Sequence, residues 1–442
     1  MVAMEQTVWS RKRTRRLVYY ALGASLVVLF AGWWTGSGAL LQSPADRLIA
    51  IGRLFGLLAT YGVLLEMFLM SRLPLIEKNF DLGETVTWHK LNGYAVLATI
   101  TGHVVFLLMG YGMQGHLGWW PQFLQFNTQF EEVLSATAGT VVFFGAAAIS
   151  VQAVRRKLRY EVWHLAHLAM YLAILMAFSH QLQNGGDFIG HTWFSAYWYA
   201  IYFFAFATVG YFRFLRPAIN YYRHRFKVLE VRQEADTVYS VYITGKDISK
   251  FRFEPGQYAT WHILSGRLWL EGHPFSFSSQ PGGEVIRFTA KATGDFSARI
   301  QNLQPGTPIV IDGPRGSFTA ERAGSYTVLL VAGGIGITPY IAMIDALLKE
   351  GKAVTLLYAI RSAGDMAFRS ELDELQQRGL KMRTFIGEQK QRIDRQILEQ
   401  YAAKSDTVVY VCGPEGMSRA MTETLHTLGL PKRQIITERF AV

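Results

Sequence analysis

The chain has 442 residues, enough for two or three domains, with 50% hydrophobic and 14% aromatic residues and a formal net charge of +11. Its single cysteine, Cys412, excludes an intrachain disulfide and any zinc or iron–sulfur site built from cysteines. The positive charge does not indicate a nucleic-acid partner, because Lys and Arg gather at the edges of predicted membrane helices.

The first half of the chain is predicted to be a membrane domain. Up to about residue 216 it has long apolar stretches with few charges, whereas the rest mixes charges, glycines and short apolar runs, as soluble α/β domains do. About 20 apolar residues span a bilayer. We therefore predict six transmembrane helices, at 17–35, 48–70, 89–112, 134–154, 161–181 and 194–215. The first is too long, and lacks the cleavage site, for a signal peptide.

The distribution of basic residues predicts the orientation of these helices. Lys and Arg are common in the N-terminal segment, in the 71–88 loop and near residues 155–160 and 223–227, and are absent from 36–46, 113–133 and 182–193. Since basic loops stay in the cytoplasm, we expect a multi-pass protein of the cell membrane with both termini and the soluble half in the cytoplasm.

Histidines on two predicted helices suggest metal ligands. His89 and His103 are fourteen residues apart, which is about 21 Å of helix, and they point the same way. His167 and His180, on the fifth helix, are about 19.5 Å apart. Histidine is costly in hydrocarbon, and two matched pairs could hold two haems, the inner by His89 and His167, the outer by His103 and His180. Because thirteen residues turn about 220°, a local π or 3₁₀ irregularity is expected between His167 and His180.

Other polar residues of this half have less specific interpretations. Four histidines at matched depths argue against the alternative that they only form hydrogen bonds inside the bundle. His164 is expected at a haem edge or the interface rather than as a ligand. For His116 and His191, in outer loops, solvent exposure is favoured over binding of metal or substrate. Arg53 lies just inside the outer face of the second helix. It would pair with a haem propionate and steady a reduced oxygen species, or extend to lipid phosphate.

The second half shows the pattern of a strand-rich segment followed by a βαβ unit. Alternating strands are predicted at 238–245 and 284–290, and 291-KATGDFSARIQN-302 reads as a turn and helix start. The buried strand 327-TVLLVAGG-334 leads into 333-GGIGITP-339 and a helix, an arrangement that binds a pyrophosphate. Further strands at 354–362, 382–387 and 407–414, with helices near 367–378, 393–401 and after Glu415, predict a doubly wound sheet. Arg361 could meet a 2′-phosphate or be a solvated loop residue.

Motifs in both halves resemble one family. The soluble half resembles the ferredoxin–NADP⁺ reductase family, and the membrane half resembles the ferric reductase transmembrane domain. The motifs are HPFS at 273–276, GGIGITP at 333–339, RSAGDMAFRSEL at 361–372, CGPEGM at 412–417 and ERF at 438–440, with SRLPL at 71–75, HK at 89–90 and YEVWHLAHL at 160–168. The chain is therefore similar to a compact bacterial NADPH oxidase.

The resemblance implies three cofactors and a set of residues for each. FAD would be held by His273, Pro274, Phe275, Ser276, Lys291, Gly294, Asp295, Phe296 and Ser297, with Phe440 stacked on its ring. NADPH would be held by Gly333, Gly334, Gly336, Thr338, Pro339, Arg361, Cys412, Gly413 and Pro414, with Cys412 near the nicotinamide. Two b-type haems would be held by His89, His103, His167 and His180. Arg53, Cys412 and Phe440 are the residues expected at the reacting groups.

The resemblance also implies a fold and an activity. We expect a membrane α-helical bundle at 17–216, after a short cytoplasmic segment at 1–16, an antiparallel β-barrel FAD domain at 217–322 and a doubly wound NADPH domain at 323–442. Electrons would pass from cytoplasmic NADPH to oxygen outside, giving superoxide. The alternatives are a ferric iron reductase, which the few acidic residues of the outer loops disfavour, an electron donor to a periplasmic partner, and a transport or scaffold protein with a vestigial reductase domain.

Overall fold

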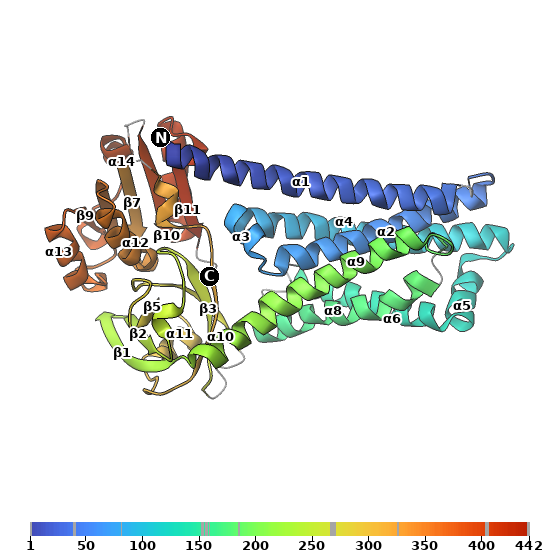
Figure 1. Cartoon of the computed structure of the whole chain (residues 1–442), viewed down its shortest axis with the longest axis horizontal. Coiled ribbons are helices and arrows are strands. Elements are labelled where there is room, and N and C mark those ends of the chain that lie inside the picture. The colour runs from blue at the N-terminus through green and yellow to red at the C-terminus, as the bar shows by residue number, and fades with distance from the viewer. Residues whose placement is uncertain are drawn as a thin grey trace. The chain divides into compact units, whose positions relative to one another are not determined.

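The structure is a computed structural model that describes residues 2–38, 41–80, 82–151, 154, 158, 160–183, 186–265, 271–324, 327–402 and 406–439. The chain forms two compact units. One is helical and consists of Arg15–Ile76 and Leu82–Arg213, and the other consists of Met1–Thr14, Glu77–Asp81 and Phe214–Val442. The second unit contains all the β-strands named below (Figure 1).

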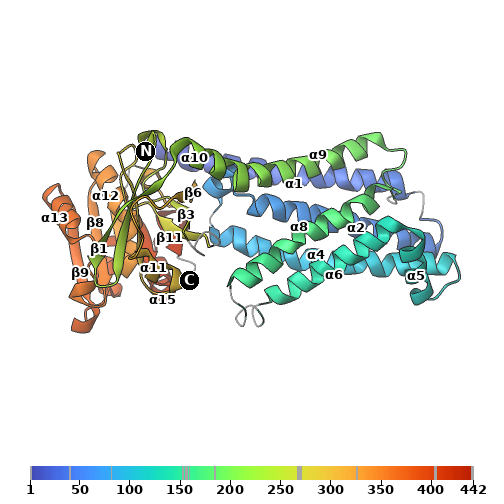
Figure 2. The same ribbon diagram turned by 90° about the horizontal axis from the view of Figure 1, so that it is seen from below.

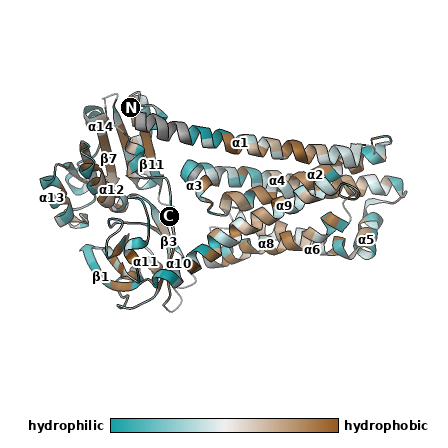
Figure 3. Cartoon of the chain, viewed as in Figure 1, coloured by the Kyte–Doolittle hydropathy of each residue, from teal (hydrophilic) through white to brown (hydrophobic). Residues whose placement is uncertain are grey.

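Long apolar helices make up the helical unit (Figure 3). They are α1 (Val2–Ser37), α2 (Pro44–Met70), α4 (Leu82–Gln114), α6 (Glu131–Ser150), α8 (Tyr160–Gln183) and α9 (Thr192–Val209), with the short α3 (Pro74–Asn79) and α5 (Trp119–Gln129) between them. Within the described residues, five helices are long and apolar enough to cross a membrane, at Arg11–Ser37, Pro44–Met70, Gly83–Gln114, Glu132–Ser150 and Val162–Gln183. The sixth predicted span is not among them, because Trp and Tyr side chains lower the hydropathy of α9.

Two helix pairs bring the histidine-bearing helices into place. The closest packing in this unit joins α2 to α4 and α6 to α8 (Figure 2). Glycines allow the first approach: a Cβ atom at Gly52, Gly56 or Gly62 of α2 would come within 2.6–2.8 Å of side chains on α4. Small residues at such interfaces are how membrane helices pack closely. The unit's core joins Leu29, Leu57 and Ile174 to the aromatic face of α9.

After α9 the chain continues through a π-helix, η2 (Gly210–Leu215), and α10 (Arg216–His224) into two antiparallel sheets. One sheet has the order β1–β2–β5 and the other β4–β3–β6. The strands are β1 (Lys227–Ala235), β2 (Val238–Thr244), β3 (Tyr258–Ile263), β4 (His273–Ser276), β5 (Ile286–Lys291) and β6 (Ile309–Arg315), with helix α11 (Asp295–Ile300) between the last two. Both sheets face one core that includes Trp261, Phe277 and Phe288. We call this part the β-domain.

A five-stranded parallel sheet follows, in the order β11–β10–β7–β8–β9. Its strands are β7 (Thr327–Gly333), β8 (Val354–Ile360), β9 (Lys381–Ile386), β10 (Thr407–Gly413) and β11 (Ile435–Arg439), and its helices are α12 (Thr338–Lys349), α13 (Arg369–Gln377), α14 (Arg395–Ala402) and α15 (Glu415–Thr427). This α/β domain confirms the predicted parallel α/β pattern. The strand order reverses between β7 and β10, and ligands of such sheets bind at that switch point.

Two ion pairs join the β-domain to the α/β domain. Arg287 of β5 binds Glu371 of α13, and Lys291 of β5 lies 3.2 Å from Asp365, which follows β8. The backbone N–H of Asp236 also donates to the carbonyl of Gly364 at 3.3 Å. The segment after β8 is thus fixed to the edge of the β-domain.

Candidate redox centres and nucleotide site

The structure brings the four predicted histidines together in two pairs. The ring centres of His89 and His167 are 6.0 Å apart, and those of His103 and His180 are 6.3 Å apart. A metal bond of about 2 Å from each facing nitrogen, plus about 1 Å from nitrogen to ring centre on each side, would separate the centres by about 6 Å. Each pair therefore has the spacing of two imidazoles on opposite sides of one metal ion.

The hydrogen bonds of His89 and His103 leave the other ring nitrogen available for such a bond. A carboxylate and a carbonyl only accept. The Nδ1–H of His89 therefore donates to Glu66 Oε2, and that of His103 donates to the Gly52 carbonyl at 2.8 Å. In both rings the proton sits on Nδ1 and the lone pair on Nε2. Ligating histidines are commonly oriented in this way by a second partner.

Ser150 is the hydrogen-bond partner of His167. Its hydroxyl oxygen lies 2.7 Å from the Ala146 carbonyl and 3.0 Å from His167 Nδ1. With the hydroxyl proton donated to Ala146, the serine oxygen accepts the Nδ1–H of His167, as in the other two rings. Trp163 also donates to Ser150 at 3.3 Å and stacks on the His167 ring. For His180, Nδ1 is buried without a hydrogen-bond partner among the described residues.

The prediction of a π or 3₁₀ irregularity in the fifth helix is wrong. The α8 segment is α-helical from Tyr160 to Gln183, with no π or 3₁₀ turn between His167 and His180. Both pairs form on the regular helix, with ring planes at 82° for His167 and His89 and at 51° for His180 and His103. The π-helix of the chain lies after α9, at Gly210–Leu215.

Arg53 lies among protein groups rather than reaching freely toward lipid. It donates to the Tyr111 hydroxyl at 3.2 Å, and a Cβ on Gly186 would come within 2.4 Å of its guanidinium. The remaining histidines are outside the two pairs. His164 contacts Trp163, His116 is exposed after α4, and His191 caps the start of α9.

The predicted flavin residues gather at one end of the β-domain. His273 opens β4, and its ring stacks on Phe296 of α11 at 3.9 Å. Phe275 packs between Phe288 and Phe296, and Pro274 is exposed. The Ser276 hydroxyl is buried without a hydrogen-bond partner among the described residues, as expected of a group that a bound ligand would satisfy.

The GDFS segment forms the start of α11. This helix begins at Asp295, with Gly294 as its N-cap. The Ser297 hydroxyl accepts the backbone N–H groups of Thr293 and Gly294 at 3.1 and 3.0 Å, so the serine closes the turn by itself.

The two glycine-rich turns of the α/β domain touch at the switch point. A Cβ on Gly336 would lie 2.3 Å from the Cys412 carbonyl, and one on Gly333 would lie 2.5 Å from Met417 Sδ. Gly334 has a φ of +52°, which favours glycine. In α12, Thr338 donates to the Ile335 carbonyl at 3.0 Å and is followed by Pro339. Gly413 ends β10, and Pro414 caps α15.

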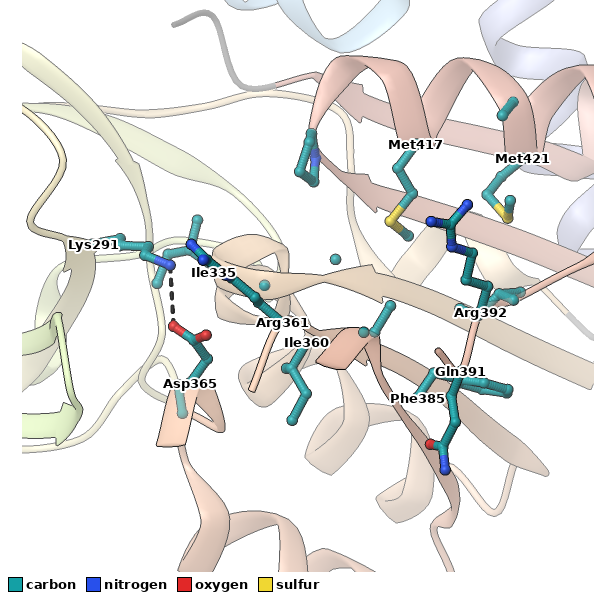
Figure 4. A pocket seen from close by; sticks show the side chains of 18 of the residues that line it. Lys291, Ile335, Ile360, Arg361, Asp365, Phe385, Gln391, Arg392, Met417 and Met421 are labelled. Atoms are coloured by element: carbon teal, nitrogen blue, oxygen red, sulfur yellow. Dashed lines mark hydrogen bonds and ion pairs between the residues drawn. The ribbon is translucent and has the colours of Figure 1, made fainter. Parts of the chain in front are cut away.

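A cavity of about 600 Å³ opens beside these turns (Figure 4). Its lining includes Gly333, Gly334, Pro414 and Met417 from the switch point, Arg361 and Asp365 after β8, and Gln391 and Arg392 after β9. Lys291, predicted at the flavin phosphates, lines this cavity and pairs with Asp365 there. Figure 4 shows Arg392 across the cavity from Lys291.

Of the two residues expected at the reacting groups of the reductase module, the structure describes Cys412. Cys412 is fully buried in the core of the α/β domain, and burial raises the pKa of its thiol well above the usual range. Phe440 lies outside the described residues.

Three residues at these sites were missed in the sequence. Glu66 was detectable, because a carboxylate in an apolar helix is expensive and usually functional. Arg392 had a weaker signal, its place just after a strand at the edge where ligands bind. The role of Ser150 depends on the packing of α6 against α8, for which the sequence contains no sign.

Three family models match successive parts of the chain. Residues 55–178 match the ferric reductase like transmembrane component, 223–318 an FAD-binding domain and 330–423 an oxidoreductase NAD-binding domain. The chain has the domain architecture of the NADPH oxidase and ferric reductase family. In this architecture a membrane domain is fused to a reductase module. The protein is therefore an oxidoreductase suited to electron transfer from NAD(P)H.

Individual relatives resemble the reductase module. The chain is 28% identical over 235 residues to a flavohemoprotein of Burkholderia sp. (strain TH2), covering 49% of this chain and 58% of that protein. It is 28% identical over 237 residues to the reductase component of propane 2-monooxygenase of Mycolicibacterium goodii, covering 49% and 67%. The chain thus spans 58% to 67% of the length of these relatives.

Among solved structures, the chain is similar to the flavohem-like FAD/NAD binding domain of nitric oxide dioxygenase from Vibrio cholerae O1 biovar El Tor. It is 26% identical, with a TM-score of 0.42, and the alignment covers 48% of this chain and 97% of that one.

Proposed function

We propose that the protein transfers electrons from cytoplasmic NADPH across the membrane to molecular oxygen outside, releasing superoxide. The observation that carries the proposal is the two histidine pairs, with ring centres 6.0 and 6.3 Å apart and with the Nε2 lone pairs of His89 and His103 available to a metal ion. Bound FAD would accept a hydride and two b-type haems would carry single electrons, the chemistry that such cofactors supply.

The histidine pairs favour haem over a bare metal ion. Among the described residues, no group of three or more His, Cys, Asp or Glu side chains could hold a metal ion. Two imidazoles alone leave most of the coordination sphere unfilled, and a porphyrin supplies the other four nitrogens. His89 and His167 would hold the inner haem, and His103 and His180 the outer one, about 21 Å away along α4.

The reductase module would hold the two nucleotides. Ser276, whose buried hydroxyl lacks a partner among the described residues, would face the flavin, with His273 and Phe296 beside it. The turns at Gly333–Ile337 and after Gly413 would receive the pyrophosphate and nicotinamide of NADPH. Arg361 would meet the 2′-phosphate, and Phe440 would cover the flavin ring.

The outer face would receive the acceptor. Arg53 follows Gly52, whose carbonyl accepts the His103 proton, and its guanidinium donates to the neutral Tyr111 hydroxyl and interacts with the Asp187 carboxylate. A fixed cation of this kind stabilises the negative charge that a neutral oxygen molecule gains on reduction. The positions of Lys and Arg in the loops support a cytoplasmic reductase module.

Optical spectroscopy of purified protein tests the proposal. We expect a b-type haem spectrum that is reduced by NADPH without oxygen and re-oxidised on exposure to air. The double variant His103→Leu/His180→Leu should lose one haem, whereas His116→Asn, at an exposed position with a φ of +51° that Asn tolerates, should keep both. Both haems retained in the double variant would disprove the ligand assignment, and a colourless wild-type protein would disprove the whole route.

The acceptor is tested by the product. Dye reduction that superoxide dismutase abolishes would support oxygen as the acceptor. Dye reduction that is insensitive to this enzyme, together with faster turnover on chelated Fe³⁺ than on oxygen, would instead identify a ferric reductase. Haems that NADPH reduces and that neither acceptor re-oxidises would indicate a donor to a periplasmic partner.

A further inference from the structure

The inner histidine pair has an anion beside it, in the membrane helix α2. Glu66 lies among apolar residues, with 16% of its side chain exposed, and its Oε2 accepts the Nδ1–H of His89. Its Oε1 accepts a hydrogen bond of 2.6 Å from the Asn92 amide, which also donates to the Gly62 carbonyl at 2.8 Å. Both carboxylate oxygens are therefore held in place. A carboxylate at such a position is costly and usually functional.

Among the described residues, no carboxylate forms a hydrogen bond with the histidines of the outer pair. His103 donates to a backbone carbonyl, that of Gly52, and His180 Nδ1 is buried without a partner in the part of the chain that the structure describes. The second ligand of the inner pair, His167, donates to the neutral hydroxyl of Ser150. A carboxylate, that of Glu66, thus accepts a hydrogen bond from a histidine of the inner pair, and no carboxylate among the described residues accepts one from the outer pair.

This difference has a direct electronic consequence. A hydrogen bond to a carboxylate is stronger than one to a carbonyl, and it draws the proton away from the ring, so Nε2 of His89 becomes a more basic ligand. A more basic ligand favours the oxidised form of the metal that it binds. Lys90, the cation next to His89, is exposed to solvent, which weakens its opposing effect.

We propose that Glu66 is a positioning residue that lowers the reduction potential at the inner histidine pair relative to the outer pair. The inference rests on the proposed function, because it requires haem at both pairs. Arg53, next to the Gly52 that accepts the His103 proton, would add a cation on the outer side, and the Asp187 carboxylate that interacts with it reduces this effect. Glu66 and Arg53 are thirteen residues apart on α2, about 19.5 Å, so one helix makes the transfer from inside to outside downhill.

A redox titration of the full-length protein, followed by haem absorbance, tests this. The variant His103→Leu/His180→Leu reports the inner haem alone, and His89→Leu/His167→Leu the outer haem alone. In the variant that retains the inner haem alone, the additional substitution Glu66→Gln keeps a hydrogen-bond acceptor but removes the negative charge. We expect the inner equilibrium to shift toward the reduced form by about tenfold, which is 59 mV for one electron.

Two control variants separate charge from structure. Glu66→Asp retains the anion and should keep the inner potential close to that of the parent. Glu84→Gln removes a carboxylate from α4 that pairs with Arg15 and has 38% of its side chain exposed, so it should change nothing. An inner potential that Glu66→Gln leaves unchanged would overturn the proposal.

A second comparison holds even if Glu66→Gln fails to bind haem. The inner haem, measured alone in the presence of native Glu66, should have a lower potential than the outer haem measured alone. An inner potential equal to or above the outer one would overturn the inference while leaving the proposed electron route intact. Absence of haem from the wild-type protein would overturn both.

Discussion

Arg287 and Glu371 join the β-domain to the α/β domain through a bidentate ion pair, with Nη1–Oε1 at 2.5 Å and Nη2–Oε2 at 2.8 Å. Arg287 is only 5% exposed and also donates to the Ser278 carbonyl and the Tyr242 hydroxyl. Burial lowers the pKa of Arg287, but the hydrogen bond and charge of Glu371 outweigh that effect and raise the pKa. The pair fixes the relative position of the parts that would hold FAD and NADPH.

Removal of the carboxylate should loosen this junction. In Glu371→Gln the buried guanidinium loses its nearer anionic partner and keeps Glu234 at 3.9 Å, and a lost hydrogen bond to a charged group costs about 1.5–3 kcal/mol. We expect the lower end of that range, since Glu371 is partly exposed. The midpoint for thermal release of FAD, measured by flavin fluorescence, should fall. Asp373→Asn, on an exposed face of the same helix, should leave it unchanged.

The two arginines of the cavity should discriminate between nucleotides. If Arg361 and Arg392 bind the 2′-phosphate, Arg361→Ala and Arg392→Ala should each raise KM for NADPH by about 10- to 100-fold, the equivalent of one charged hydrogen bond. The KM for NADH should change little. Arg395→Ala, an exposed arginine of α14, serves as the control. Equal changes for both nucleotides would mean that neither arginine reads the phosphate.

The role of Ser150 can be tested at the inner haem. Ser150→Ala removes the acceptor of the His167 proton, and loss of such a partner typically weakens metal binding by about 10- to 100-fold. Haem should then pass faster to a scavenger protein. Thr140→Ala, on the same helix, removes a hydroxyl that only bonds the Ala136 carbonyl of its own helix. Identical rates in the two variants would contradict the assigned tautomer.

Cys412 should be unreactive in the folded protein. Because burial raises the pKa of its thiol, the reactive thiolate forms only at a pH above the usual range for cysteine. Iodoacetamide should therefore label native protein very slowly at pH 8, with a rate that still rises toward pH 10, and should label one site once guanidinium unfolds the chain. Fast native labelling that NADPH blocks would instead place the thiol at the nicotinamide.

Much of the fold was predictable because its signals are local. The strand predicted at 407–414 is Thr407–Gly413, and that at 327–334 is Thr327–Gly333, since apolar runs bounded by glycines define buried parallel strands. The pairing of His89 with His167 followed from helix rise and chain direction. The membrane half was less exact at α9, where aromatic residues make hydropathy a poor guide to a span.

The missed features depend on contacts between distant segments. Arg287 and Glu371 are 84 residues apart, and neither has a local pattern that marks it as buried or paired. His180 meets His103 although α8 is a continuous α-helix, an outcome that the turn of about 220° between His167 and His180 did not predict. Glu66 could have been found from the cost of its charge, although its partner could not.

Strand β5 supplies both anchors of the junction, Arg287 and Lys291, four residues apart and so on one face of the strand. The distance between them, about 13 Å, is set by the backbone rise of a strand. Length changes during evolution should therefore accumulate in the turn at 280–283 and avoid 287–291. A single residue gained or lost between the anchors would turn one of the two side chains to the other face of the strand. The ion pair of that side chain with the α/β domain would then be lost.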